Sequence, residues 1–199
     1  MDNQTLNYYN ANAQKFVEGT VGVDFHITQD RFLAQLEKGA SILDFGCGSG
    51  RDTKYFLERG YAVEATDGSK ELCKLASEHT GISVKKMLFD ELYAVAKYDG
   101  IWACASILHL GWADLVVVMR KMVRAVKGEG VIYTSFKYGH FTGERNGRFF
   151  TDLDEEGLAR LLKEVGGLEV KELWITGDVR PGRGEEKWLN VLLKKRCFR

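Results

Sequence analysis

The sequence predicts an α/β fold, a three-layer sandwich in which a mainly parallel sheet of seven strands carries helices on both faces. Three observations predict it. Short apolar runs typical of buried strands alternate with amphipathic segments typical of helices along most of the 199 residues. A turn with three glycines joins the first apolar run to a helix. The last two apolar runs are separated by residues 177–186, too few for a crossover helix, so the last strand is expected to be antiparallel.

The composition fits a single domain over residues 1–199, with 45% hydrophobic and 28% charged residues. Lysine plus arginine and aspartate plus glutamate number 28 each, so there is no bulk basic field to recruit nucleic acid or an anionic membrane. No signal-like segment and no run of 18 apolar residues is seen, so secretion and membrane insertion are not expected. The four cysteines form no C-x-x-C pair, which favours reduced thiols in a cytoplasmic protein: Cys47, Cys73, Cys104 and Cys197.

The N-terminal part of the chain precedes the first strand. Residues 1–20 are polar and rich in Asn, Gln and Tyr, and a short helix around Tyr8 and Tyr9 is expected there. A second helix is expected from Thr28 to Lys38, with Ile27 as its hydrophobic staple and Thr28 as its cap.

Strands and helices then alternate. The expected strands are residues 42–45, 61–67, 82–89, 98–106, 131–136, 168–176 and 187–195. The expected helices are residues 52–59, 70–79, 115–127 and 152–165. Apolar side chains recur at helical spacing, as in Val116, Met119 and Val123, which predicts one buried face.

The stretch from Asp44 to Gly50 reads Asp-Phe-Gly-Cys-Gly-Ser-Gly and predicts a ligand-cradling turn. Its glycines let the backbone turn tightly and let a ligand approach the main chain. A dinucleotide fingerprint would need glycine at position 51, which is Arg51, and no Gly-Lys-Ser/Thr follows as a P-loop requires. Asp67 ends the next strand, near the offset of about 20 residues at which a carboxylate accepts from ribose hydroxyls.

An acid, three alternating glycines and a second acid together resemble the first motif of class I S-adenosylmethionine-dependent methyltransferases. The resemblance runs from about Leu36 to Tyr138. Within that superfamily the chain is most similar to small bacterial methyltransferases of the tellurite-resistance and ubiquinone/menaquinone-type group. The resemblance implies a Rossmann-like fold, S-adenosyl-L-methionine as cofactor, and an N-terminal segment, residues 1–27, that caps the cofactor pocket.

The resemblance also implies the cofactor contacts. Asp67 binds the ribose hydroxyls, and Gly46 and Gly48 contact the methionine part. Gly68 lets the adenine lie close and Phe89 flanks it, while Asp90 or Glu91 accepts from its exocyclic amine. The expected cofactor residues are Asp44, Gly46, Cys47, Gly48, Gly50, Asp67, Gly68, Phe89, Asp90 and Ser106.

Methyl transfer from a sulfonium is an in-line displacement, so the protein mainly has to align the acceptor. A base is needed only when the acceptor arrives protonated. His109 follows the fourth strand and is the candidate catalytic base or substrate contact; the alternative is a histidine that packs or caps the next helix. No cluster of His, Cys and Asp has metal-ligand spacing, so no metal is expected.

Basic residues are concentrated in two late segments. Lys137, His140, Arg145 and Arg148 lie within twelve residues, and Arg180 and Arg183 flank the single proline. A cationic rim for an anionic acceptor is one interpretation; solvated charges paired with Glu144, Glu185 and Glu186 are the other. Tyr8 and Tyr9 either border the acceptor or only pack. The expected acceptor residues are Tyr8, Tyr9, Lys137, Arg148 and Arg180.

Several methyltransferase subclasses lack their motifs here. The position after the fourth strand reads Ala-Cys-Ala-Ser instead of the Pro-Pro motif of enzymes that methylate DNA amino groups, and Cys104 is not preceded by the proline of cytosine-C5 enzymes. We therefore predict metal-independent methyl transfer to a small-molecule acceptor. An RNA or protein methyltransferase and a non-catalytic S-adenosylmethionine-binding protein remain alternatives, and the acceptor atom and oligomeric state stay open.

Overall fold

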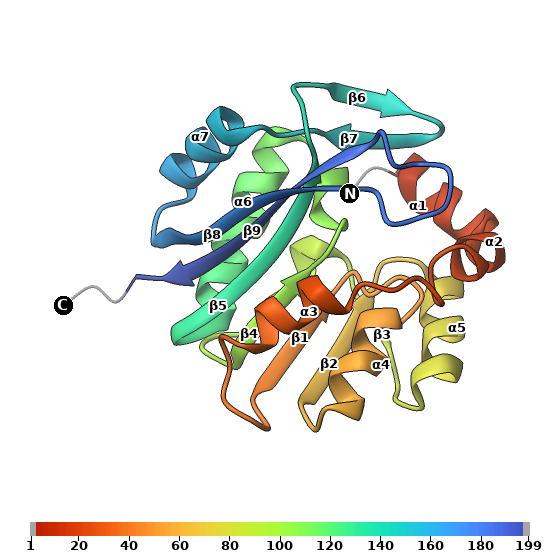
Figure 1. The fold of residues 1–199 in the computed structure, drawn as a ribbon, viewed down its shortest axis with the longest axis horizontal. Coiled ribbons are helices and arrows are strands. Elements are labelled where there is room, and N and C mark those ends of the chain that lie inside the picture. The colour runs from red at the N-terminus through yellow and green to blue at the C-terminus, as the bar shows by residue number, and fades with distance from the viewer. Residues whose placement is uncertain (1–2, 197–199) are drawn as a thin grey trace.

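The computed structural model describes residues 3–196, which form a seven-stranded sheet in the order β3-β2-β1-β4-β5-β9-β8 (Figure 1). Cys197 lies outside the described residues. The strands of this sheet are β1 (Ser41–Phe45), β2 (Ala62–Asp67), β3 (Lys85–Lys86), β4 (Tyr98–Ala103), β5 (Val126–Lys137), β8 (Leu168–Gly177) and β9 (Lys187–Lys195). The α/β class and the seven-stranded sheet predicted from the sequence are confirmed.

The sheet pairing also agrees with the prediction. β1 pairs in parallel with β2 and β4, and β5 continues the parallel sheet beside β4. β9, the last strand, is antiparallel to both β5 and β8. The chain therefore reverses its winding direction between β1 and β4, the switch point where open α/β sheets hold ligands.

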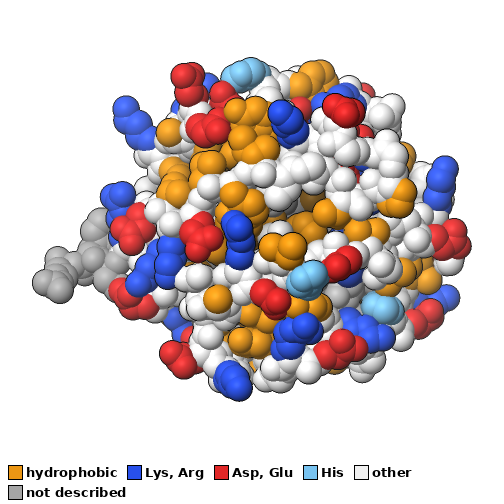
Figure 2. Space-filling model, in the orientation of Figure 1, with side chains coloured by type: hydrophobic (Ala, Val, Ile, Leu, Met, Phe, Trp, Pro, Cys, Tyr) orange, Lys and Arg blue, Asp and Glu red, His pale blue; other side chains and the backbone are white. Residues whose placement is uncertain are grey.

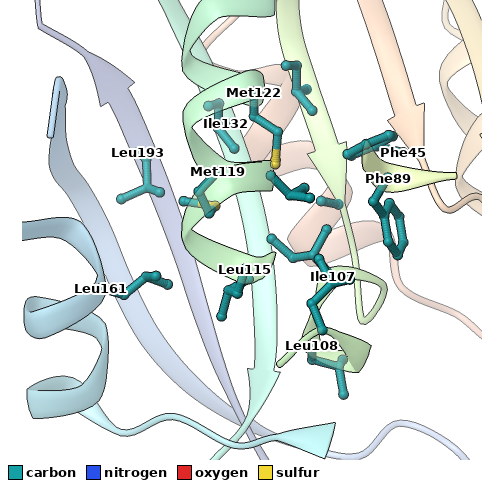
Figure 3. Packing of buried hydrophobic residues seen from close by; sticks show 14 of the residues in the cluster. Phe45, Phe89, Ile107, Leu108, Leu115, Met119, Met122, Ile132, Leu161 and Leu193 are labelled. Atoms are coloured by element: carbon teal, nitrogen blue, oxygen red, sulfur yellow. The ribbon is translucent and has the colours of Figure 1, made fainter. Parts of the chain in front are cut away.

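Helices cover both faces of the sheet. They are α3 (His26–Leu33), α4 (Arg51–Glu58), α5 (Lys70–Thr80), α6 (Trp112–Ala125) and α7 (Glu155–Val165). Adjacent residues of β1 point to opposite faces: Ile42 joins the cluster under α3 and α4, whereas Leu43 joins the larger cluster under α6 and α7. Figure 3 shows that larger cluster, with Leu115 and Met119 of α6 near Leu161 of α7.

Several expected elements differ in their bounds; β5, for example, begins at Val126, five residues before the expected start at residue 131. The helix predicted from Thr28 to Lys38 is α3, which begins at His26 and ends at Leu33; Thr28, the expected cap, is buried inside it, and Phe25 occupies the cap position without a side-chain hydrogen bond. The expected third strand, residues 82–89, is reduced to the two residues of β3. It is followed by the short helix η1 (Phe89–Glu91).

The N-terminal residues form two helices, α1 (Asn3–Ala11) and α2 (Ala13–Glu18). A hairpin of β6 (Thr142–Arg145) and β7 (Arg148–Thr151), which the sequence analysis did not predict, stands apart from the main sheet. Its turn is Asn146-Gly147, both with positive φ, as a two-residue hairpin turn requires. The Phe149 N–H of β7 donates to Thr5 Oγ1 of α1 at 3.0 Å, so the N-terminal helices and the hairpin meet (Figure 1).

The surface in Figure 2 mixes acidic, basic and hydrophobic side chains over the viewed face. Acidic and basic groups alternate there, in keeping with the formal net charge of zero. Among residues 3–196, no helix combines the length and apolar content needed to cross a membrane.

Candidate active site

A cavity of about 610 Å³ lies at the carboxyl ends of β1, β2, β4 and β5, within the size range of small-molecule sites. The N-terminal helices, the β6–β7 hairpin and the β8–β9 loop complete its walls. Twelve of the predicted site residues line it: Tyr9, Gly46, Cys47, Gly48, Asp67, Gly68, Phe89, Ser106, His109, Lys137, Arg148 and Arg180. Four do not, namely Tyr8, Asp44, Gly50 and Asp90.

The glycine loop is held by the end of the neighbouring strand β2. The backbone N–H groups of Gly46 and Cys47 both donate to the Thr66 carbonyl oxygen at 2.9 Å. Gly46 has φ 85°, and a Cβ added there would lie 2.5 Å from Ser106 Cβ. A side chain at position 46 would therefore both strain the backbone and collide with the β4 end.

Asp67 is fixed by backbone donors at the end of β2. Gly48 N–H donates to Asp67 Oδ2 at 3.0 Å, and Ser69 N–H donates to Asp67 Oδ1 at 2.8 Å. Burial raises the pKa of Asp67, and these backbone hydrogen bonds partly oppose that rise. The arrangement holds a carboxylate in the cavity wall with lone pairs left for hydroxyl donors.

Asp44 lies behind the glycine loop. Its Oδ2 accepts from Thr53 Oγ1 of α4 at 2.5 Å, and burial together with the Asp52 charge raises its pKa to about 8. Asp44 therefore ties β1 to the helix that follows the loop.

Arg51 and Asp52 line the cavity, although the sequence analysis assigned them no role. Asp52 accepts from both Arg51 Nε (2.8 Å) and Arg51 Nη2 (3.0 Å). Trp102 Nε1 and Gln29 Nε2 donate to the same carboxylate at 2.8 and 2.7 Å. The sequence feature that could have indicated Arg51 and Asp52 is that they form an adjacent Arg-Asp pair directly after the glycines.

The N-terminal helices cover the glycine loop. The Phe16 ring of α2 lies so close to Gly48 that a Cβ added there would be 3.0 Å from Phe16 Cε1. Ser69 Oγ donates to Asn10 Oδ1 of α1 at 2.7 Å, just past the end of β2. These contacts place α1 and α2 over the switch point.

His109, in the short helix η2 (Ile107–His109), is buried with both ring nitrogens engaged. Its Nδ1 lies 2.7 Å from the Phe149 carbonyl oxygen, which can only accept, so Nδ1 carries the proton. Nε2 then accepts from the Tyr9 hydroxyl at 2.9 Å. Burial lowers the pKa of His109 to about 4, so the ring is neutral at physiological pH.

Most cations of the predicted rim have acidic partners. Asp178 of the β8–β9 loop accepts from Arg180 Nε and Nη2 at 2.9 and 2.5 Å and from Lys137 Nζ at 3.4 Å. Lys137 also pairs with Glu186. Arg145 pairs with Asp152 at 2.5 Å.

Arg148 differs from these cations. Its Nη1 donates to the Tyr9 hydroxyl at 3.4 Å, and its guanidinium lies 4.5 Å from the centroid of the Tyr8 ring. Its Nε is buried without an acceptor. Within residues 3–196 Arg148 forms no ion pair.

Two further sequence expectations concern cysteine and metal chemistry. Burial raises the pKa of Cys104 to about 12, so its thiol remains protonated near neutral pH. Over the described range, 3–196, no group of three His, Cys, Asp or Glu side chains is arranged to hold a metal ion.

The strand order and the glycine loop at the switch point give an α/β domain with the topology that class I methyltransferases share. Residues 42–130, the part that contains β1 through the start of β5, match the family described as a methyltransferase domain. Residues 42–130 are therefore similar to a methyltransferase domain, in line with the sequence resemblance to class I S-adenosylmethionine-dependent methyltransferases.

Known proteins extend this comparison. The malonyl-[acyl-carrier protein] O-methyltransferase of Salmonella typhimurium is 30% identical over 101 residues. The match covers 47% of this chain and 37% of that enzyme, so this chain spans little more than a third of the enzyme's length. The structure of the 1,6-didemethyltoxoflavin-N1-methyltransferase of Burkholderia thailandensis superposes with a TM-score of 0.80 at 21% identity, over 98% of this chain and 88% of that one. A TehB-like methyltransferase of Corynebacterium glutamicum gives 0.70 at 18% identity, over 96% and 98%. At these identities the two structures establish the fold.

Proposed function

We propose that the protein transfers a methyl group from S-adenosylmethionine to a small-molecule acceptor bound in the same cavity. The observation that carries the proposal is the cavity itself. One wall is the glycine loop with Asp67, and another wall contains the cations of the hairpin and of the β8–β9 loop. A site of this kind has room for a nucleoside cofactor and a second small ligand.

The cofactor residues follow from the geometry of the loop. Asp67, fixed by two backbone N–H groups, accepts from the ribose hydroxyls. Gly46 and Gly48 leave the main chain open to the methionine part, and Phe89 flanks the adenine. Asp44 acts indirectly, since its bond to Thr53 fixes the loop from behind.

When bound, S-adenosylmethionine supplies an electrophilic sulfonium methyl group. The residues of this chain contribute mainly position, because in-line displacement needs an aligned acceptor more than an acid or a base. His109 is a weak base whose lone pair already accepts from Tyr9, so its contribution is to hold the Tyr9 hydroxyl in the cavity wall. The proposed reaction uses no metal ion.

The acceptor is proposed to be small. The N-terminal residues 1–27 act as a cap, of which Leu6, Tyr9, Phe16 and Phe25 line the cavity. The Burkholderia enzyme has 1,6-didemethyltoxoflavin and S-adenosylhomocysteine bound in a structure of the same fold, which supports a small acceptor here. Balanced overall charge also favours a small ligand over a nucleic acid.

Calorimetric titration with S-adenosylmethionine, S-adenosylhomocysteine and NADH tests the cofactor. We expect wild type to bind the two sulfur compounds but not NADH. Asp67→Ala removes hydrogen bonds to a charged acceptor worth about 1.5–3 kcal/mol each, so affinity should fall about 100-fold or more. Asp114→Ala, an exposed acid in the first turn of α6, is the matched control and should bind as wild type does.

Failure of folded wild-type protein to bind either sulfur compound would contradict the proposal. Cofactor binding without transfer of labelled methyl to any acceptor in a broad small-molecule screen would instead favour a non-catalytic binding protein.

A further inference from the structure

We propose that Arg148 forms a carboxylate-binding subsite, so that the acceptor is a small carboxylate anchored between the β6–β7 hairpin and α1. This inference rests on the proposed function and specifies its acceptor. Of the three cations expected to contact the acceptor, only Arg148 is proposed to bind its negative charge; Lys137 and Arg180 are not.

The charges of the cavity wall lead to Arg148. Lys137 and Arg180 share Asp178, whose side chain is only 3% exposed, and Lys137 also pairs with Glu186. Arg145 is paired with Asp152. An incoming anion would have to displace a buried carboxylate from these cations, whereas Arg148, among the described residues, has no carboxylate to displace.

The surroundings of Arg148 indicate which anion fits. Its guanidinium lies 4.5 Å from the Tyr8 ring centroid and 5.2 Å from that of Phe150, and it reaches a single neutral oxygen, the Tyr9 hydroxyl. A planar guanidinium packed near aromatic rings can present paired N–H donors to the two oxygens of a carboxylate. One unpaired cation matches one negative charge, which favours a carboxylate over a phosphate dianion.

The buried Nε of Arg148 is the second observation. A buried donor without an acceptor destabilises a protein by about 1–3 kcal/mol. Such donors are therefore uncommon unless a ligand accepts their hydrogen bond, and Arg148 Nε is one of them. Because Nε itself is buried, the side chain has to turn toward the cavity for a bound carboxylate to supply the missing acceptor. The neighbouring His109 ring is neutral and adds no competing positive charge.

The aromatic lining indicates the rest of the ligand. Tyr9 and Phe150, whose ring centroids lie 5.8 and 5.2 Å from the Arg148 guanidinium, line the cavity, and Phe16 lines it as well. Apolar walls with one charged anchor suit an acceptor with a flat apolar body and one carboxylate.

The test uses benzoate as a probe and benzamide as its uncharged counterpart, titrated calorimetrically into protein saturated with S-adenosylhomocysteine. We expect benzoate to bind wild type and benzamide to bind at least tenfold more weakly. Arg148→Gln should weaken benzoate binding at least tenfold. Arg148→Lys keeps the charge but not the planar fork, and should recover only part of that loss.

Arg145→Gln is the matched comparison, because it removes a neighbouring cation of the same wall that already has a partner. Its effect on benzoate binding should be threefold or less. Equal losses in the two glutamine variants, equal binding of benzoate and benzamide, or no benzoate binding to folded wild type would overturn the inference. A circular-dichroism spectrum and a thermal transition like those of wild type show that each variant is folded, and each titration is repeated without S-adenosylhomocysteine.

The two proposals fail in different ways. Binding of S-adenosylhomocysteine without benzoate binding removes the Arg148 subsite and leaves the proposed function intact. Benzoate binding that depends on Arg148 in a protein that ignores S-adenosylhomocysteine removes the proposed function and leaves a carboxylate site.

Discussion

The two walls of the cavity are built in different ways. The wall formed by the β1–α4 loop and the end of β2 is fixed by backbone hydrogen bonds, such as those from Gly46 and Cys47 to Thr66. The wall formed by the hairpin and the β8–β9 loop is fixed by side-chain pairs, such as Arg145–Asp152 and Lys137–Glu186.

The difference follows from what each wall is proposed to bind. A wall of main-chain groups presents the same donors whatever side chains surround it, which suits a constant cofactor. A wall of paired side chains changes with single substitutions, which suits an acceptor that differs between related enzymes. Substitutions in the first wall should therefore act on the fold and the cofactor together, and those in the second on the acceptor.

Gly46→Ala should have the largest effect, because it damages the backbone-built wall. The new Cβ would lie 2.5 Å from Ser106 Cβ at a residue with φ 85°. Left-handed strain and the collision should together lower the free energy of unfolding by about 3–5 kcal/mol and abolish cofactor binding. Urea unfolding and calorimetry measure the two effects.

Gly60→Ala separates strain from collision. Gly60 has φ 83°, nearly that of Gly46, but no heavy atom lies within 4 Å of its added Cβ. It should lower the free energy of unfolding by about 1 kcal/mol and leave cofactor binding unchanged. Similar losses in both variants would show that the loop is not tightly packed against Ser106.

Asp178→Asn should have the next largest effect, now on the wall of paired side chains. It leaves Arg180 and Lys137 without their shared carboxylate and should lower the free energy of unfolding at pH 7 by about 3 kcal/mol. Binding of S-adenosylhomocysteine should change by threefold or less, because the glycine loop is untouched. Arg160→Gln, which breaks an exposed pair, is the control and should change stability by about 0.5 kcal/mol or less.

The effect of Asp178→Asn should depend on pH. Burial alone would raise the pKa of Asp178, but hydrogen bonds from Arg180 and Trp188 outweigh it and hold the pKa below its ordinary range. A lowered folded-state pKa contributes stability that is present above about pH 4 and lost as pH falls. The difference in Tm between wild type and variant should therefore shrink as pH falls from 7 to 3. A constant difference would mean that ionised Asp178 is not the stabilising species.

Phe16→Ala should have the smallest effect of the three. It uncovers Gly48 without altering the loop, so S-adenosylmethionine affinity should fall about tenfold, equivalent to about 1.4 kcal/mol of lost apolar contact. Calorimetry measures this loss, and Ile27→Ala, which truncates a side chain that is 65% exposed, is the control. Unchanged affinity would show that α2 does not cover the bound cofactor.

Much of the backbone-built wall could be predicted from sequence because its determinants are local. The alternation of apolar runs gave the order of strands and helices, and the short segment 177–186 gave the antiparallel β9. Gly46, Gly48 and Asp67 follow their strands directly, and all three line the cavity. Asp90 does not, because the short helix η1 buries Phe89 and leaves the next residue exposed.

The other wall depends on contacts between distant segments, which spacing does not reveal. The bond between Tyr9 and His109 joins residues a hundred positions apart, and nothing local in either segment indicates it. Among the described residues Arg148 has no ion-pair partner, and this becomes visible only when the acidic partners of the neighbouring cations are known. The β6–β7 hairpin did have a local signal, Asn146-Gly147, which the sequence analysis overlooked.

The Phe16 ring over Gly48 and the bond from Ser69 to Asn10 have a kinetic consequence. A molecule held against the glycine loop cannot leave past these helices until both contacts break. If a bound cofactor leaves by this side, its release requires α1 and α2 to lift, a motion of the microsecond-to-millisecond kind that limits turnover in many enzymes. The helices α1 and α2 would thus set the rate of release by that route.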